Sequence, residues 1–453
     1  MNLPERFKTQ MKQLLGSEYE AYEKSFEQHR VCGLRVNTMK ISVEEFLNLT
    51  PFSLEPVPWA EDGFYYDPSQ EVTKHPHYYA GLYYIQEPSA MIPASRLPVS
   101  PGERVLDLCA APGGKATRLG AKLEGEGLLV ANDVSNSRAK GLLKNLERFG
   151  IGNMLVTSET PKRLAEAFPS YFDKILIDAP CSGEGMFRRD PAMVKNWEEQ
   201  GPEYYSRLQK EILQEAVKML KPGGMMLYST CTFARMENEE NVRFLLERGP
   251  GMRVVPMEGA DGLEADADLH AIRLFPHRAR GEGHFAALLQ REGGGKDSAG
   301  EKKGRRQAAG KTALPESLLD FLRSLKRFSW DVQDVRMLNG RAYLLPKEGE
   351  GLPSLRYLRT GLYLGEVKKN RFEPSQALAM YLRLCQAPAS LTLPSGDPRV
   401  IRYLKGETLE LSDGEAAGLA GWVLFGTDGY PLGWGKLVNG TLRNKYYPGW
   451  RMQ

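Results

Sequence analysis

The chain has 453 residues, of which 42% are hydrophobic and 26% are charged, as in an ordinary soluble globular protein. These values exclude a mainly disordered chain, a collagen and a coiled coil. Lysine and arginine number 60 and aspartate and glutamate 57, so the net charge of +3 does not by itself indicate a polyanionic partner. No apolar run has the roughly 18 residues that a membrane span needs.

The start of the chain and its cysteines indicate a cellular compartment. The segment MNLPERFKTQ is charged and lacks the apolar core of a signal peptide. The five cysteines are few, odd in number and widely spaced: Cys32, Cys109, Cys181, Cys231 and Cys385. They form neither a disulfide framework nor the CxxC pairs of a zinc site. We therefore expect a protein of the reducing cytoplasm that holds no structural metal.

The first 95 residues are expected to form an α+β unit of their own. This part opens with a helix-like stretch, followed by a short strand at Arg35 to Asn37 and then by many turns and aromatic residues.

From residue 96 to residue 292, short apolar runs alternate with helix-like segments. The predicted strands are VLDLC (105–109), LLVAND (128–133), NMLVTS (153–158), FDKILID (172–178) and GGMMLYST (223–230). One predicted helix covers 116–123, and another is capped by Ser135 and ends at Phe149. Strands that are apolar throughout and alternate with helices predict a parallel sheet in an α/β domain. Residues 273–290 are typical of a closing hairpin.

The remaining part of the chain is expected to begin with a linker. Residues 293–312 are Gly-rich, highly charged and nearly free of large apolar side chains, so they cannot bury a core. Structure resumes near Leu314 and is divided here into units at 313–375 and 376–453. The last unit ends in an aromatic β pattern with an Asn439-Gly440 hairpin turn.

The segment AAPGGK (110–115) lies between the first strand of the α/β region and its helix. It is not a Walker loop, because Cys109 and Ala116 stand where that loop has Gly and Ser or Thr. It is not a dinucleotide fingerprint either, because its two glycines are adjacent. Asp133 follows the second strand, where an acid can accept ribose hydroxyls. This pattern indicates a nucleoside ligand such as S-adenosylmethionine. The loop alone is equally typical of a tight turn with a helix-capping aspartate.

Two cysteines stand directly after predicted buried strands, Cys181 in DAPCSG and Cys231 in STC. The carboxyl ends of parallel strands meet at one edge of the sheet, so both thiols should lie there with Asp178. Either cysteine alone would be interpreted as a small buried hydrophobic residue. Their shared position beside a nucleoside site favours a catalytic role.

A thiol has a specific use at such a site. A thiolate that adds to carbon 6 of a pyrimidine turns the ring into an enamine, and carbon 5 can then attack a methyl sulfonium. Loss of the carbon-5 proton and elimination of the thiolate restore the ring. Asp178 is placed to supply a proton or hydrogen bond at nitrogen 3, and the second thiol to take the carbon-5 proton or release the adduct. Methylation at an exocyclic nitrogen uses an Asp/Asn-Pro-Pro-aromatic motif, whereas this strand ends in DAPC.

Together these motifs resemble the Nop/Sun family of RNA cytosine-C5 methyltransferases. The resemblance covers most of the chain, through RVNTMK, YIQEPSAM, DLCAAPGGKAT, DAPCSGEG, YSTCTF with ENE, and FPHR with GEGHFAALL. The C-terminal pattern resembles the bacterial branch that modifies small-subunit ribosomal RNA. The resemblance implies a Rossmann-like, S-adenosylmethionine-dependent methyltransferase domain, an N-terminal α+β extension that binds RNA and a β-rich, PUA-like C-terminal RNA-binding region. It further implies a cytoplasmic, monomeric enzyme that acts on 16S ribosomal RNA in the small subunit.

The resemblance also implies roles for single residues. Cys231 matches the family's nucleophile, Cys181 the cysteine that assists product release, and Asp178 the acid that contacts cytosine near the methyl donor. The donor site would comprise Cys109, Ala110, Ala111, Pro112, Gly113, Gly114, Lys115, Asp133, Arg138 and Asp178.

The chain departs from the family pattern at one position. Many relatives carry an aspartate there that holds the adenine amino group, whereas this chain has Thr160, preceded by Glu159. The side chain of either residue, or the backbone, could make that contact.

Further residues are candidates for RNA contact. Arg188 and Arg189 could hold phosphates beside a flipped or single-stranded base, or could belong to a solvated loop. Aromatic and basic residues alternate near the C-terminus, which suits RNA stacking or, equally, a small β-barrel core: Trp422, Tyr430, Trp434, Lys436, Arg443, Lys445, Tyr446, Tyr447 and Trp450. The segment KKGRR (302–306) favours a solvated linker, and His277 and His284 favour structural hydrogen bonding.

Two other functions remain compatible with the residues. The same chemistry could act on transfer RNA, since fold and motifs do not separate RNA substrates. A catalytically silent RNA-binding factor in ribosome assembly is the third hypothesis, although it gives no reason for two thiols beside a cofactor cleft.

Overall fold

The computed structural model describes residues 3–259, 263–266, 268–293, 313–347, 351–369 and 371–453. The predicted linker and KKGRR lie outside the described residues, apart from Gly293. The chain begins with two helices, α1 (Glu5–Leu15) and α2 (Tyr19–Ser25). Their apolar side chains pack with Phe187, Trp197 and Phe233 of the α/β region. These two helices therefore attach to the part of the chain that carries the predicted catalytic residues.

A four-stranded antiparallel sheet follows, in the order β2-β3-β1-β4. Its strands are β1 (Cys32–Val36), β2 (Leu54–Val57), β3 (Ala60–Tyr66) and β4 (Tyr83–Ile85), with helices α3 (Val43–Leu49) and α4 (Pro76–Tyr79). Helix α3 begins with a capping box, in which the Ser42 hydroxyl accepts from the Glu45 amide while the Glu45 carboxylate accepts from the Ser42 amide.

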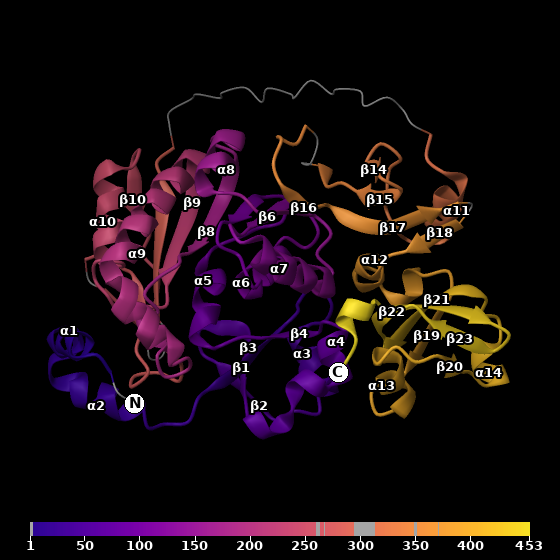
Figure 1. Cartoon of the computed structure of the whole chain (residues 1–453), viewed down its shortest axis with the longest axis horizontal. Helices are drawn as coiled ribbons and strands as arrows, with labels where there is room; N and C mark the ends of the chain where they lie inside the picture. Colours follow the sequence, from indigo (N-terminus) through magenta and orange to yellow (C-terminus); the bar gives the residue numbers. More distant parts are fainter. Residues whose placement is uncertain (1–2, 260–262, 267, 294–312, 348–350, 370) are drawn as a thin grey trace.

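A ten-stranded sheet forms the centre of the molecule (Figure 1). Its strands are β5 (Arg104–Asp107), β6 (Leu128–Asn132), β7 (Met154–Thr157), β8 (Phe172–Asp178), β9 (Leu220–Thr230), β10 (Met252–Val254), β11 (Leu263–Ala265), β12 (Ile272–Leu274), β13 (His284–Arg291) and β16 (Tyr357–Thr360). The order is β11-β12-β13-β9-β8-β5-β6-β7-β16, and β10 pairs with β13. Strands β5 to β9 are parallel to their neighbours within this group. The predicted parallel sheet and α/β class are confirmed.

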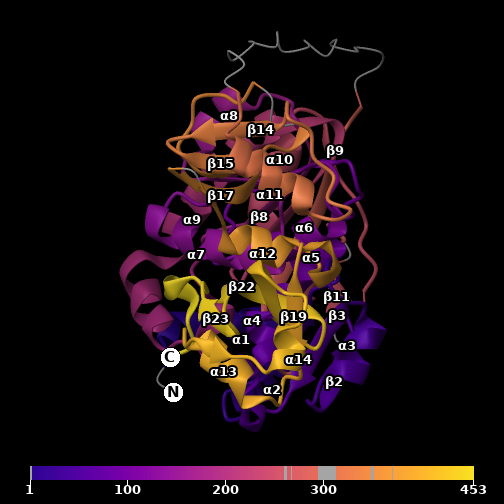
Figure 2. The same ribbon diagram turned by 90° about the vertical axis from the view of Figure 1, so that its right-hand side faces the viewer.

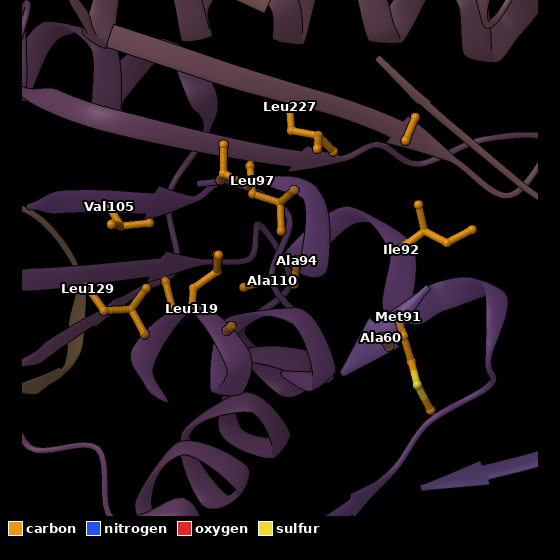
Figure 3. Packing of buried hydrophobic residues seen from close by; sticks show 14 of the residues in the cluster. Ala60, Met91, Ile92, Ala94, Leu97, Val105, Ala110, Leu119, Leu129 and Leu227 are labelled. Atoms are coloured by element: carbon orange, nitrogen blue, oxygen red, sulfur yellow. The ribbon is translucent and has the colours of Figure 1, made fainter. Parts of the chain in front are cut away.

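Helices cover both faces of this sheet. Helices α5 (Ile92–Arg96), α6 (Gly114–Lys122) and α7 (Asn136–Phe149) share one hydrophobic cluster with it, and α8 (Pro161–Ala167), α9 (Ala192–Met219) and α10 (Glu239–Arg248) share a second. Helix α9 is interrupted at Gly201, which has a positive φ. Figure 3 shows the first cluster, in which Val105 and Leu129 point toward Leu119 of α6. Leu106, which follows Val105 in β5, belongs to the second cluster, because successive side chains of a strand point to opposite faces of the sheet.

The C-terminal part holds two smaller sheets. The first has the order β14-β15-β17-β18, with β14 (Val335–Leu338), β15 (Arg341–Leu344), β17 (Leu362–Lys368) and β18 (Arg371–Pro374), next to α11 (Glu316–Ser324) and α12 (Gln376–Tyr381). The second has the order β19-β21-β22-β23-β20, with β19 (Ser390–Leu393), β20 (Leu409–Glu410), β21 (Gly421–Thr427), β22 (Tyr430–Val438) and β23 (Thr441–Asn444), next to α13 (Pro398–Leu404) and α14 (Asp413–Ala416). The predicted turn joins β22 to β23, and both Asn439 and Gly440 have positive φ there.

The C-terminal part, which faces the viewer in Figure 2, is joined to the rest of the molecule at several places. Strand β16 pairs antiparallel with β7 and so extends the central sheet. One hydrophobic cluster contains Leu34 and Tyr83 of the N-terminal sheet together with Val423 of β21. The His77 Nε2 atom also lies 2.8 Å from a carboxylate oxygen of Asp428. The N-terminal and C-terminal parts therefore share a core.

The described part of the chain contains no helix with both the length and the apolar character needed to cross a membrane.

Candidate active site

The residues singled out in the sequence gather at the carboxyl edge of the central sheet. Asp178 is the last residue of β8, and Cys231 follows Thr230, the last residue of β9. The two strands are parallel, and Asp178 lies in register with Ser229. Asp133 follows β6 directly. This edge is where ligands bind in open α/β sheets.

The two cysteines are adjacent. Their Sγ atoms lie 3.3 Å apart. The loops that carry them are fastened to each other, because the Gly185 amide donates to the Cys231 carbonyl at 2.9 Å and the hydroxyls of Ser182 and Thr232 lie 2.8 Å apart. The neighbouring Cys231 thiol and burial together raise the pKa of the Cys181 thiol well above its ordinary value.

Glu237, in the ENE motif that follows YSTCTF, binds the loop that carries Cys181. Its carboxylate accepts from the Ser182 amide at 3.0 Å, from the Ser182 hydroxyl at 2.5 Å and from the Gln209 side chain at 2.9 Å. Burial raises the pKa of Glu237 to about 7, against the effect of these hydrogen bonds. Glu237 had no predicted role from the sequence, although it stands in the ENE motif.

Asp178 is surrounded by donors. Lys115 donates to Oδ2 at 2.7 Å and the Ser229 hydroxyl donates to Oδ1 at 2.9 Å, while His284 Nε2 lies 3.6 Å from Oδ1. Burial alone would raise the pKa of Asp178, but Lys115 and His284 outweigh it and hold the pKa well below its usual range. Asp178 is therefore an ionised acceptor of hydrogen bonds in the neutral range.

The predicted donor loop is built as a tight strand-to-helix turn. Gly113 has a φ of 115°, and a Cβ atom there would lie 3.2 Å from a methyl group of Leu142. Helix α7 holds the loop from the side, because Arg138 donates to the Ala111 carbonyl at 2.9 Å and Asn145 to the Pro112 carbonyl at 2.8 Å. Only glycine combines this backbone conformation with so close an approach of α7.

The acids beside this loop fit a nucleoside that carries a positive charge. The carboxylate of Asp133 is nearly buried at the end of β6, with Arg138 at 3.4 Å. Asp107, the last residue of β5, is fully buried, and neither carboxylate oxygen has a hydrogen-bond partner among the described residues. Burial, then the charge of Asp178, raises the pKa of Asp107 to about 8. This carboxyl is therefore mostly protonated at pH 7, and a cationic ligand such as S-adenosylmethionine would favour its ionised form. Asp107 was missed in the sequence, where it stands in the DLC segment.

Both side chains considered for the adenine contact are engaged within the protein. The Thr160 hydroxyl accepts from the Arg163 amide at 3.4 Å and caps α8. The Glu159 carboxylate accepts from the Arg356 amide at 2.8 Å and from its guanidinium at 3.3 Å. Arg356, which donates both hydrogen bonds to Glu159, lies directly before β16.

The two arginines after DAPCSGEG differ in their surroundings. Arg188 is 8% exposed and donates to Glu282 at 2.8 Å and to the Ser25 carbonyl at 2.8 Å. It therefore joins α2 to the segment before β13, and the hypothesis that it holds phosphate is wrong. Arg189 is exposed.

The C-terminal aromatic residues are divided between core and surface. Trp434, Tyr446 and Trp450 are buried in the core, as the β-barrel interpretation predicted, whereas Tyr447 is 55% exposed. The basic side chains Lys436, Arg443 and Lys445 are exposed.

The two histidines also differ. His277 Nε2 lies 3.0 Å from a carboxylate oxygen of Glu18, which is the structural hydrogen bonding expected from the sequence. His284 is buried beside Asp178, and neither of its ring nitrogens has a hydrogen-bond partner among the described residues. The expected structural hydrogen bonding is therefore wrong for His284. Among the residues that the structure describes, no group of three or more histidine, cysteine, aspartate or glutamate side chains could hold a metal ion.

Four family models match the chain. Residues 94–290 match the 16S rRNA methyltransferase RsmB/F, and residues 3–88 the N-terminal domain of 16S rRNA methyltransferase RsmF. Residues 320–382 match the first C-terminal domain of the RsmF rRNA methyltransferase, and residues 390–452 the methyltransferase RsmF PUA domain.

Individual proteins are similar over different lengths. The ribosomal RNA small subunit methyltransferase F of an Enterobacter species is 31% identical over 98% of this chain and 95% of its own length. The protein of that name from Pectobacterium atrosepticum is 40% identical, over 57% of this chain and 56% of its own. A crystal structure of a methyltransferase homologue from Pyrococcus horikoshii, 31% identical, covers 64% of this chain and 95% of its own with a TM-score of 0.56.

Proposed function

This chain belongs to the RsmF family of 16S rRNA methyltransferases, and from that membership we propose that it methylates carbon 5 of a cytosine in 16S ribosomal RNA, with S-adenosylmethionine as donor. The observation that carries this proposal is the pair of thiols, 3.3 Å apart, at the same sheet edge as the ionised Asp178. A thiol pair has a use in methylation at a ring carbon and none in methylation at an exocyclic nitrogen.

The donor would be held at the turn after β5. Asp133 would accept the ribose hydroxyls, the backbone of 109–115 would lie against the ligand, and Asp107 would face its positive charge. Arg138 would act mainly by keeping the loop in place through the Ala111 carbonyl. When bound, S-adenosylmethionine supplies a methyl group on a positively charged sulfur.

In this proposal the protein activates the base through Cys231. Its thiolate adds to carbon 6, which turns carbon 5 into a nucleophile, and it leaves again when the carbon-5 proton has been lost. Cys181, in contact with Cys231, assists release of the product. A flipped or single-stranded cytosine is needed, because a base stacked in a helix cannot reach the thiol.

The low pKa of Asp178 modifies one detail expected from the sequence. An ionised carboxylate accepts hydrogen bonds, so Asp178 would bind the amino group of cytosine rather than protonate nitrogen 3. Uracil has a carbonyl at that position, and its oxygen would face the carboxylate without a proton between them. Asp178 would therefore select cytosine.

The other parts of the chain would bind the RNA. We assign residues 1–95 to an RNA-binding extension, 96–292 to the methyltransferase domain, 313–375 to an α+β unit and 376–453 to a PUA-like RNA-binding unit. Exposed Tyr447 and Lys445 suit stacking and phosphate contact. The substrate would be the small ribosomal subunit or its RNA, and the enzyme a cytoplasmic monomer.

In the test, the wild type, Cys231→Ala and Cys181→Ala are each incubated with labelled S-adenosylmethionine and one RNA substrate. The substrates are small ribosomal subunits, naked 16S RNA and bulk transfer RNA. We expect labelled 5-methylcytosine in 16S RNA with the wild type, none with Cys231→Ala, and a stable protein–RNA adduct with Cys181→Ala. Label in transfer RNA alone would overturn the substrate. Binding of the donor without label in any RNA would support an RNA-binding assembly factor instead.

A further inference from the structure

His284 is a buried histidine that the proposed mechanism does not use. Its side chain is 3% exposed, and neither ring nitrogen has a hydrogen-bond partner within range among the described residues. Its Nε2 atom lies 3.6 Å from Oδ1 of Asp178. A buried polar group without partners costs free energy, so such a group inside a candidate active site calls for a functional reason.

Strand register places His284 beside Cys231. In the antiparallel pair of β9 and β13, Thr230 lies opposite Phe285 and Ser229 opposite Ala286. Cys231 and His284 come next to the pair of Thr230 and Phe285 in the chain, one just after the end of β9 and the other at the start of β13. Gly185 supports this closeness, because a Cβ atom there would lie 3.0 Å from the carbonyl oxygens of both Cys231 and Gly283.

The same register places the side chains on one face of the sheet. Side chains two residues apart along a strand point the same way, so Cys231 shares a face with Ser229, and His284 shares a face with Ala286. Ser229 lies opposite Ala286 and in register with Asp178. His284 and Asp178 therefore lie on the face of the sheet that Ser229 shares, and Cys231 follows the end of the strand between them.

Burial favours the neutral form of His284, against the combined effect of the acids around it. Burial lowers the pKa of His284, Asp178 opposes this, and Lys115 adds to it, while Glu87 acts in the same direction as Asp178. A neutral imidazole keeps one nitrogen lone pair and can accept a proton. The ionised Asp178 lies where it can stabilise the imidazolium that results.

Three neighbours of Asp178 and Cys231 are poorer proton acceptors than a neutral imidazole. Lys115 is bonded to Asp178, which raises the pKa of Lys115 against the effect of burial, so it has no lone pair to offer. Asp178 is a weak base because its pKa lies well below the usual range. Cys181 is a neutral thiol, since the neighbouring Cys231 and burial raise its pKa.

We infer that His284 is the base that removes the proton from the Cys231 thiol. The S–H bond breaks, an N–H bond forms on the imidazole, and the electron pair stays on sulfur as the thiolate that adds to carbon 6. When the thiolate is eliminated, the imidazolium returns the proton to it, and the proton that leaves carbon 5 is released to water. The imidazolium is held meanwhile by Asp178, as in other pairs of a nucleophile and a base oriented by a third group. This inference rests on the proposed function, in which Cys231 is the nucleophile.

Alkylation of Cys231 tests the inference without RNA or donor. Only the thiolate reacts with iodoacetamide, so the rate of modification, followed by mass spectrometry of the Cys231 peptide from pH 6 to pH 9, reports its formation. His284→Asn should react about tenfold more slowly than the wild type at pH 7, with the rise in rate moved to higher pH. His277→Asn is the matched control, because His277 contacts Glu18 instead, and should keep the wild-type profile.

Two further measurements make the outcome decisive. Circular dichroism and binding of labelled S-adenosylmethionine show that each variant is folded, and His284→Gln is used if His284→Asn is not. Equal alkylation profiles in wild type and a folded His284 variant would overturn the inference. If the alkylation profiles are equal and the wild type still methylates 16S RNA, the proposed function stands and only the role of His284 is overturned. If Cys231 is alkylated more slowly in the His284 variant but the wild type methylates no RNA, the proposed function is overturned and the role of His284 is not.

Discussion

The sulfur atoms of Cys181 and Cys231 lie 3.3 Å apart although the residues are separated by 50 positions in the chain. The contact follows from the parallel pairing of β8 with β9, since each thiol stands just beyond the end of one strand. Two reduced thiols at this distance can be joined with little movement of their loops, which leads to a first prediction.

Treatment with the thiol oxidant diamide should link Cys181 to Cys231 and abolish methylation. The two thiols would lose two hydrogen atoms to diamide and form one disulfide, which removes the nucleophile. Peptide mapping without reductant should find the link, and dithiothreitol should restore the activity. Cys385→Ser should behave as the wild type, because Cys385 is exposed elsewhere. Full activity after diamide, with both thiols free, would contradict this prediction.

Replacement of Lys115 by Met should impair methylation most at low pH. Lys115 is the largest of the influences that lower the pKa of Asp178, so the pKa of this carboxyl should rise in the variant. The loss of one charged donor should cost roughly a hundredfold in kcat/KM, and more toward acid pH, because the raised pKa makes Asp178 easier to protonate. The measurement is kcat/KM from pH 5 to pH 8. Lys122→Met, on the same helix but bonded to the Ser95 and Leu97 carbonyls, should keep the wild-type pH profile.

Glu237 should make the protein less stable as the pH rises. Burial raises the pKa of Glu237 from an ordinary 4.5 to about 7, so the folded state binds its proton more tightly than the unfolded state does. This contribution is complete below pH 4.5 and is lost as the pH passes through 7. It amounts to about 3 kcal/mol at most. Urea unfolding at pH 5 and pH 8 should show this decrease in the wild type and a smaller one in Glu237→Gln. An identical decrease in both would refute the assignment.

Adjacent arginines should affect different properties. Arg188→Ala leaves Glu282 buried without its partner, so the free energy of unfolding should fall by about 3–5 kcal/mol. Arg189→Ala removes an exposed charge and should leave unfolding unchanged while weakening binding of 16S RNA, more so at low salt. Urea unfolding and RNA filter binding measure the two effects. A stable Arg188→Ala with weakened RNA binding would show that Arg188 contacts RNA after all.

Local patterns predicted those parts of the fold that depend on neighbouring residues. The predicted strand at 172–178 coincides with β8, because a run of apolar residues bounded by turn residues leaves little choice of ends. The Ser135 hydroxyl accepts from the Arg138 amide at 3.5 Å, as its position before an amphipathic helix indicated. Motifs placed Cys181, Cys231 and Asp178 at one edge, because each stands at the end of a strand or shortly after it.

Features that depend on distant pairing could not be predicted. Nothing in residues 357–360 indicates that they join β7, which lies 200 positions earlier in the chain. The burial of Arg188 requires Glu282 and Ser25, neither of which is near it in sequence. His284 was expected only to make structural hydrogen bonds, because its place beside Asp178 depends on the pairing of β9 with β13, and a single histidine in a strand has no distinctive pattern.

The pairing of β16 with β7 has a consequence for synthesis of the protein. All strands of the central sheet up to β13 have been synthesised once residue 291 is made, but β7 then still has a free edge. That edge stays exposed until another seventy or so residues have been translated and β16 can cover it. An exposed strand edge is a template for pairing with other chains. A nascent chain stalled between β13 and β16, or a gene truncated there, should therefore depend on chaperones to remain unaggregated.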